Sequence, residues 1–266
     1  MEEGVIFENS VRAGVDVSAR YLLRAFDAVL LALGAGTPRD LPLPGRSLAG
    51  IRFALDFLSR QNRLVSGEAV PSAEPAEVRG RDVLVIGGGD TGSDCVGTAR
   101  RLGARSVVQA ELLPRPPDSR LPSDPWPNWP RILRTSCSQE EGCDRLWSVA
   151  VREFVGEGSV RAARCVRLDY PQGGGEPREI PRSGFEIPAD LVLLAAGFLH
   201  VEPSPLLSDL ALPLDPRGNL RAGPEGRTSL PKVFAAGDCN VGPSLVATAL
   251  AAGRRAAASV HSYLSA

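Results

Sequence analysis

Short, predominantly apolar runs are the most regular feature of this chain. They occupy residues 26–35, 83–86, 189–198 and 232–236, and each one ends at or close to a glycine. An apolar run of this length is typical of a strand that is buried on both faces of a parallel sheet. The pattern therefore predicts four buried strands in an α/β fold.

Helical periodicity separates these runs. Cys95, Ala99 and Leu102 recur at helical spacing and lead to Gly103, where a glycine can end a helix. Residues 48–64 and the alanine-rich residues 244–264 are also predicted to be helical. The remaining pattern predicts a short helix over 18–23 capped by Ser18, a strand over 106–113, and a strand over 160–169 that pairs with a second one reaching Ile180.

A glycine motif follows the strand at 83–86 directly. The six residues of this G-x-G-x-x-G motif are Gly87, Gly88, Gly89, Asp90, Thr91 and Gly92. In such a motif the first glycine allows a tight turn, the second lets the backbone approach a pyrophosphate, and the third lets helix and strand pack closely. The helix that follows directs free N–H groups and a positive dipole end at the phosphates.

An acid completes this unit. Glu111 ends the next apolar run, about twenty residues beyond Gly92, where a carboxylate binds the ribose of a dinucleotide. Strand, glycines, helix, second strand and acid therefore predict a dinucleotide site. The alternative is a doubly wound sheet whose tight turn uses glycine without binding a ligand.

The same acid bears on the choice of coenzyme. Glu111 can accept both hydrogen bonds from a ribose diol and would repel a 2′-phosphate, which favours NADH. Arg115 and Arg120 follow it and are able to pair with a phosphate, so NADPH remains the alternative.

One strand pattern occurs twice. Asp27 and Gly34 in the first run correspond to Asp190 and Gly197 in the third, with matching apolar residues between them, which suggests two related sheets. The fourth run ends in Gly237 and Asp238, and a helix of small residues begins near Ser244. An acid at a strand tip beside a helix N-terminus suits a polyhydroxyl ligand, although an ordinary turn residue is the alternative.

Composition narrows the class of protein. The 266 residues carry a net charge of −1 and are 43% hydrophobic and 23% charged, as in globular proteins, so nucleic acid and anionic membranes are not expected as partners. No apolar run reaches the ~18 residues of a membrane span, and the acidic N-terminus is unlike a signal, so we expect a cytoplasmic protein. Five scattered cysteines and two histidines predict neither a metal site nor a redox disulfide, and we expect no catalytic side chain.

Residues 113–131 form a proline-rich segment that also holds Trp126 and Trp129. Its prolines exclude a regular helix, and a loop of this length in a compact domain is usually functional. The two tryptophans either cover a ligand or anchor the loop, and anchoring is favoured.

Several sequence stretches together resemble the pyridine-nucleotide-dependent flavoprotein reductases, and specifically the small (β) subunit of glutamate synthase. The matching stretches are PRDLPLPG with IRFALDFL, VLVIGGGDTGSDCVGTARRLGARSV, ELLPRPP with DPWPNWPRI, ADLVLLAAGF, and VFAAGDC with GRRAA. They follow the order of that family and extend over nearly the whole chain.

The resemblance implies an FAD domain interrupted by an inserted NAD(P)H domain. Residues 1–65 would be part of the FAD domain, 66–195 the NAD(P)H-binding domain, and 196–266 the C-terminal part of the FAD domain. The glycine motif would bind the NAD(P)H pyrophosphate, and Gly237 and Asp238 would lie at the FAD ribityl chain. Gly88, Arg115, Gly197 and Ser244 are further candidate cofactor-binding residues.

The resemblance also implies a reaction and a partner. Hydride would pass from NAD(P)H to FAD, and electrons would continue to the glutamate synthase large subunit or another electron-accepting subunit in glutamate biosynthesis. The family's iron–sulfur segment and first FAD-binding glycine loop have no counterpart in these residues, so we expect the chain alone to bind FAD weakly or not at all. The alternative function is a nucleotide-binding module without redox activity that serves assembly or regulation; oligomerisation is left open.

Overall fold

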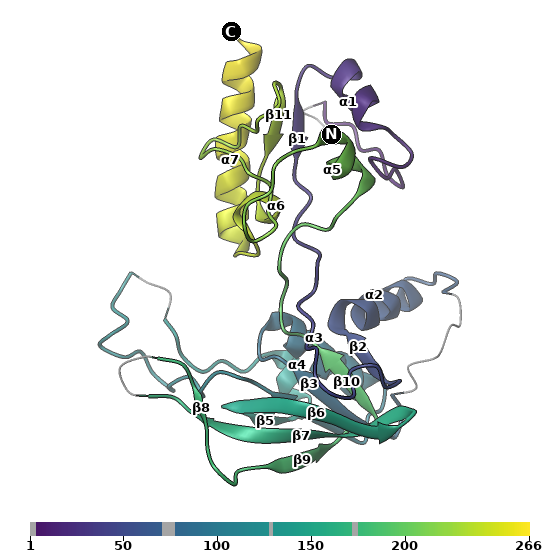
Figure 1. Ribbon diagram of the computed structural model, residues 1–266, viewed down its shortest axis with the longest axis vertical. Helices are drawn as coiled ribbons and strands as arrows, with labels where there is room; N and C mark the ends of the chain where they lie inside the picture. Colours follow the sequence, from purple (N-terminus) through teal and green to yellow (C-terminus); the bar gives the residue numbers. More distant parts are fainter. Residues whose placement is uncertain (1–3, 71–77, 128–129, 172–174) are drawn as a thin grey trace. The chain divides into compact units, whose positions relative to one another are not determined.

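The computed structural model describes residues 4–70, 78–127, 130–171 and 175–266. The chain forms two compact units, which we call the terminal unit (Met1–Arg39 with Phe198–Ala266) and the central unit (Asp40–Gly197). The chain passes from the terminal unit into the central unit once and returns once (Figure 1). The central unit is therefore an insertion in the terminal one.

A five-stranded parallel sheet forms the middle of the central unit, in the strand order β2-β10-β3-β4-β5. Both neighbours of the central strand β3 run parallel to it, which is why its residues 83–86 are apolar without interruption. The strands are β2 (Ile51–Phe53), β3 (Asp82–Ile86), β4 (Ser106–Ala110), β5 (Asp144–Leu146) and β10 (Leu191–Leu194).

Different layers cover the two faces of this sheet. Val83 and Val85 pack against helices α2 (Ala54–Val65) and α3 (Asp90–Arg101), whereas Leu84 lies in the core on the opposite face. An antiparallel sheet covers that second face (Figure 1). It consists of β6 (Val149–Glu157), β7 (Ser159–Asp169), β8 (Arg178–Glu179) and β9 (Phe185–Pro188), and the short helix α4 (Cys137–Glu140) packs beside α3.

The terminal unit holds a two-stranded parallel sheet, in which β1 (Val29–Leu31) pairs with β11 (Val233–Ala235). Leu31 and Val233 belong to a core with helices α1 (Ala19–Ala25) and α5 (Pro205–Leu210). On the other face, Tyr263 of helix α7 packs edge-on against Phe234. Helix α6 (Asp238–Val241) directly precedes α7 (Val246–Leu264).

Most of the expected elements are present. The strands predicted at 26–35, 83–86, 189–198 and 232–236 correspond to β1, β3, β10 and β11, and Ser18 caps α1 through the Tyr21 N–H (3.2 Å). The repeated strand pattern places β1 and β10 in two parallel sheets, one in each unit. Within the described ranges, no helix is long and apolar enough to cross a membrane.

The helix predicted over 48–64 begins later than expected. Residues 51–53 instead form β2, and α2 begins only at Ala54. Ile51 pairs with Val192 of β10, so a neighbouring strand satisfies the backbone there. Residues 40–65 consequently pack within the central unit, whereas the domain assignment from sequence placed residues 1–65 together.

Candidate nucleotide-binding site

The glycine motif forms the turn between β3 and α3. Gly87 has φ of 127°, and a Cβ atom there would overlap the carbonyl oxygen of Ala195. A Cβ atom at Gly92 would overlap the carbonyl oxygen of Gly87. Both positions thus require glycine, and they bring α3 close to the end of β3.

The helix start beyond this turn is open. Gly89 is the N-cap of α3, and no side chain caps its first N–H groups. Apart from its own residue and its two chain neighbours, a Cβ atom at Gly89 would have no atom within 4 Å, and the φ of −78° at Gly89 is ordinary. Asp90 and Thr91 occupy the first helical turn. The site therefore leaves room beside N–H groups that can bind an anion.

Glu111 lies at the glycine turn, as the motif predicted. Its Oε2 accepts the N–H of Gly88 (2.6 Å), and its Oε1 accepts the N–H of Leu113 (2.9 Å). These two bonds fix the orientation of a half-buried carboxylate. Because a carboxylate can accept about four hydrogen bonds, Glu111 retains acceptor capacity for the hydroxyls of a ribose. The residues present therefore fit a dinucleotide.

Tyr170 also lies near Glu111, and sequence reasoning missed it. Its hydroxyl donates to the carbonyl of Leu112 (2.7 Å). Burial and the negative charge of Glu111 raise the pKa of Tyr170. Tyr170 follows β7, far along the chain from the glycine motif, so no local pattern could have indicated it.

Arg115 would have to face the 2′-phosphate of NADPH in order to bind it, but its side chain pairs with a carboxylate instead. Its guanidinium pairs with Asp118 (2.6 Å), and both side chains are exposed. The structure thus brings Glu111 to the turn and directs the charge of Arg115 to a neighbouring carboxylate.

A second group of candidate residues lies in the terminal unit. Gly237, with φ of 74°, precedes α6, and the Ser244 hydroxyl donates to Asp238 Oδ1 (2.8 Å). No side chain caps the start of α7 at Leu245. The arrangement of an acid, a hydroxyl and an open helix N-terminus fits a polyhydroxyl ligand. Gly197, with φ of 86°, instead follows β10 in the central unit.

The cysteines carry no visible redox pair. All five are free thiols, and burial raises the pKa of Cys95 to about 12 and that of Cys165 to about 11. Among the residues that the structure describes, no group of three or more His, Cys, Asp and Glu side chains could hold a metal ion.

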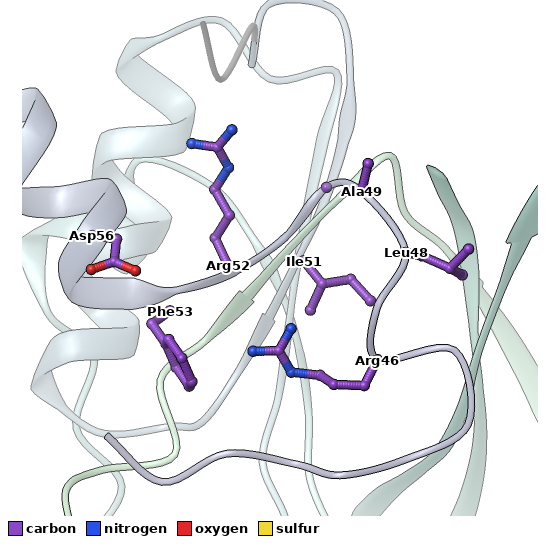
Figure 2. Close-up of a pocket in the computed structure, with 8 residues that line it drawn as sticks. Arg46, Leu48, Ala49, Ile51, Arg52, Phe53 and Asp56 are labelled. Atoms are coloured by element: carbon purple, nitrogen blue, oxygen red, sulfur yellow. The ribbon is translucent and has the colours of Figure 1, made fainter. Parts of the chain in front are cut away.

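A shallow pocket of about 440 Å³ lies at the β2 edge of the central sheet (Figure 2). Arg46 lies over the ring of Phe53 (5.1 Å) and pairs with Asp40 (2.6 Å), whereas Arg52 extends away from Arg46. None of the predicted site residues lines this pocket. It is therefore distinct from the glycine turn.

The expected anchoring of the tryptophans is wrong for Trp126. Its side chain is 83% exposed, so it is not packed into the protein. Trp129 lies outside the described residues. Whether an aromatic ring is buried depends on which other segments of the fold pack against it. The sequence of the loop alone does not show which segments these are.

Known proteins match nearly the whole chain. The glutamate synthase (NADPH) small chain of Mycobacterium tuberculosis is 46% identical over 98% of this chain and 54% of its own length. The glutamate synthase (NADH) of Schizosaccharomyces pombe is 38% identical over 97% of this chain and 13% of its own length. These matches confirm the resemblance to glutamate synthase small subunits. The chain spans about half the length of the bacterial small chain.

Solved structures show the fold. FprA from Mycobacterium tuberculosis in complex with NADPH superimposes with a TM-score of 0.70 at 19% identity, over 96% of this chain and 68% of FprA. Thioredoxin reductase from T. acidophilum gives a TM-score of 0.58 at 21% identity, over 90% of this chain and 66% of the enzyme. The fold is thus the predicted α/β type of the reductases with two dinucleotide-binding domains, one inserted in the other. A family model described as pyridine nucleotide-disulphide oxidoreductase matches residues 8–253, and this chain therefore belongs to that family.

Proposed function

We propose that this chain is the part of a glutamate synthase small subunit that binds NAD(P)H and contributes to an FAD site. The observation that carries the proposal is the glycine turn, with an open helix start and Glu111 fixed beside it. The 46% identity to a glutamate synthase small chain supports the same function.

The central unit would bind the nicotinamide dinucleotide. The first N–H groups of α3 would bind the pyrophosphate, since Gly89 leaves room for it and no side chain competes as a cap. Glu111 would accept hydrogen bonds from the adenosine ribose. A carboxylate at this place and the pairing of Arg115 with Asp118 both favour NADH over NADPH.

The terminal unit would contribute to the FAD site. Asp238, oriented by Ser244, would accept hydrogen bonds from the ribityl hydroxyls, and Gly237 would let the backbone approach them. When bound, the two cofactors supply the hydride donor and the hydride acceptor. The task of the protein is then to hold both in position, for which no side-chain acid or base is required.

The further steps belong to the same proposal. Electrons would leave for the glutamate synthase large subunit or another accepting subunit, and the protein would work in the cytoplasm. The names of the two sequence relatives support the large-subunit partner, because one is a glutamate synthase and the other is a glutamate synthase small chain.

Gly89→Ala tests the nucleotide site. The new methyl group meets no protein atom, so the free energy of unfolding should change by less than about 0.5 kcal/mol. The methyl group would occupy the space of the pyrophosphate, so the Kd for NADH should rise at least tenfold, roughly the effect of 1.4 kcal/mol. Calorimetric titration with NADH measures it.

Gly184→Ala is the matched control. Gly184 lies between β8 and β9, and a Cβ atom there also has no neighbour within 4 Å, so this variant should bind NADH like the wild type. Unchanged NADH binding in Gly89→Ala would contradict the proposed site. Reduction of an added flavin by NADH separates the reductase from a nucleotide-binding module without redox activity.

A further inference from the structure

The peptide bond between Gly87 and Gly88 is held at both ends by side chains of one strand end. Gln109 Nε2 donates to the Gly87 carbonyl (2.9 Å), and Glu111 Oε2 accepts the Gly88 N–H (2.6 Å). Gln109 lies in β4 and Glu111 directly follows its last residue, so the two side chains are two positions apart and both reach this peptide bond. Because the C=O and N–H of a trans peptide point in opposite directions, these bonds fix the peptide plane at the start of the turn.

Gln109 is itself oriented by a second buried amide. Gln139 Nε2 donates to Gln109 Oε1 (2.8 Å), and Gln139 Oε1 accepts the backbone N–H of Ser136 (3.0 Å). The backbone N–H of Ser136 can only donate, and the carbonyl of Gly87 can only accept. The two ends therefore determine which way both amides point, and the hydrogen bonds run in one direction from Ser136 to Gly87.

The far end of this chain of bonds is anchored on helix α4. Ser136 and Gln139 form a capping box, in which the Ser136 hydroxyl accepts the Gln139 N–H (3.2 Å). The Ser136 hydroxyl also hydrogen-bonds to the hydroxyl of Ser93 on α3. Gln109 is 2% exposed and Gln139 is 7% exposed, so water can hardly replace a lost partner.

We propose that Gln109 and Gln139 are positioning residues that hold the glycine turn in the conformation that binds the dinucleotide. The inference rests on the proposed function of the turn. Gln139 does not touch the turn and acts through Gln109, so a substitution at residue 139 should disturb a peptide plane that it does not contact. Helix α4 thereby supports the site, although no sequence motif connects it to the glycines.

Gln139→Met and Gln109→Met test the proposal. Methionine has a similar shape but cannot maintain the amide hydrogen bonds. Two quantities are measured: hydrogen exchange of the Gly88 amide by NMR without nucleotide, and the Kd for NADH by calorimetry. Each variant should speed exchange at Gly88 and raise the Kd about fivefold, roughly the effect of losing or loosening the one neutral hydrogen bond by which the two glutamines reach the turn, from Gln109 to Gly87. Gln61→Met on α2 makes the same chemical change on a half-buried side chain and should alter neither quantity.

A milder variant covers the case in which Gln139→Met does not fold. Ser136→Ala removes the hydroxyl of a half-buried residue at the edge of the network, and both quantities should change about twofold in the same direction. Unchanged exchange and unchanged Kd in the folded variants would overturn the proposal. The wild type could also bind no NADH while exchange at Gly88 still accelerates in the variants. In that case Gln109 and Gln139 do hold the turn, and it is the proposed function that fails.

Discussion

At the scale of single residues, one motif contains glycines with different purposes. Gly87 and Gly92 are required by the fold, because a side chain at either would overlap a backbone carbonyl. Gly89 is not required by the fold, because the space around it is open. Because Gly89 also lies at the open start of α3, a methyl group there should disturb a bound ligand without disturbing the fold, and this distinction selects Gly89 as the informative test position.

The predicted preference for NADH over NADPH also belongs to the residue scale. Glu111→Ala should raise the Kd for NADH about tenfold, because the ribose hydroxyls lose their acceptor, and should bring NADPH binding closer to NADH binding. Arg115→Ala should change NADPH binding by less than about twofold, since Arg115 is paired with Asp118 and both are exposed. Titrations with both reduced coenzymes at matched ionic strength measure these effects. Tighter NADPH binding that survives Glu111→Ala and collapses in Arg115→Ala would contradict this reading.

At the scale of elements, Asp82 connects the beginnings of three parallel strands. It is the first residue of β3, and its carboxylate accepts hydrogen bonds from Arg105 (2.8 Å) and from Ser106 at the start of β4 (2.7 Å). Its own N–H donates to Asp190, just before β10 (3.1 Å). The hydrogen bond from Arg105, and after it that from Ser106, lower the pKa of Asp82 against the opposing effect of burial.

This lowered pKa predicts a pH-dependent stability. A carboxyl whose pKa is lower in the folded state stabilises the protein above its unfolded pKa, about 3.9, and this stabilisation is lost as the pH falls through the folded value. Asp82→Asn should therefore reduce the free energy of unfolding by about 1 kcal/mol at pH 7 and by progressively less below pH 4. Urea unfolding from pH 7 to pH 3 measures the difference.

Asp209→Asn is the control for this change, since Asp209 is exposed on α5. It should leave the free energy of unfolding within about 0.5 kcal/mol of the wild type at neutral pH. A difference between wild type and Asp82→Asn that stayed constant down to pH 3 would show that the carboxylate itself is not responsible.

At the scale of the whole molecule, each compact unit carries its own group of candidate residues. The glycine turn, Glu111 and Gly197 belong to the central unit, whereas Gly237, Asp238 and Ser244 belong to the terminal unit. Each group lies where a parallel strand ends and a helix begins, the usual place for a ligand in α/β folds. Two units that each have such a strand end are consistent with a protein that binds two nucleotides.

This division predicts where each cofactor acts. Adding NADH should slow hydrogen exchange several-fold in residues 86–92 and 109–113 of the central unit and leave residues 237–244 of the terminal unit nearly unchanged. Because we expect the chain alone to bind FAD weakly or not at all, any protection by FAD should be slight, should require a high FAD concentration and should lie in residues 237–244. Exchange followed by mass spectrometry measures both. NADH protection confined to the terminal unit would refute the assignment of the coenzyme.

Short-range patterns account for the part of the site that was predictable. β3, the glycines, α3 and β4 follow each other directly, so periodicity and spacing were enough to predict them and to place Glu111 at the turn. The resemblance to a family extended the same reasoning to Gly237 and Asp238. Because each of these features lies within a few tens of residues, local preferences of the backbone decide it.

Tertiary structure alone decided the rest. Ile51 lies in a strand rather than in the predicted helix because β10, far along the chain, offers it backbone partners. Gln109 and Gln139 meet because α4 packs beside α3, and Tyr170 lies near Glu111 because β7 ends there. The sequence by itself determined the strand–turn–helix unit, since its apolar run, its glycines and its helical spacing follow one another along the chain. Distant side chains hold that unit in place. Which side chains these are depends on how segments far apart in the sequence pair and pack, and no local sequence pattern indicates that.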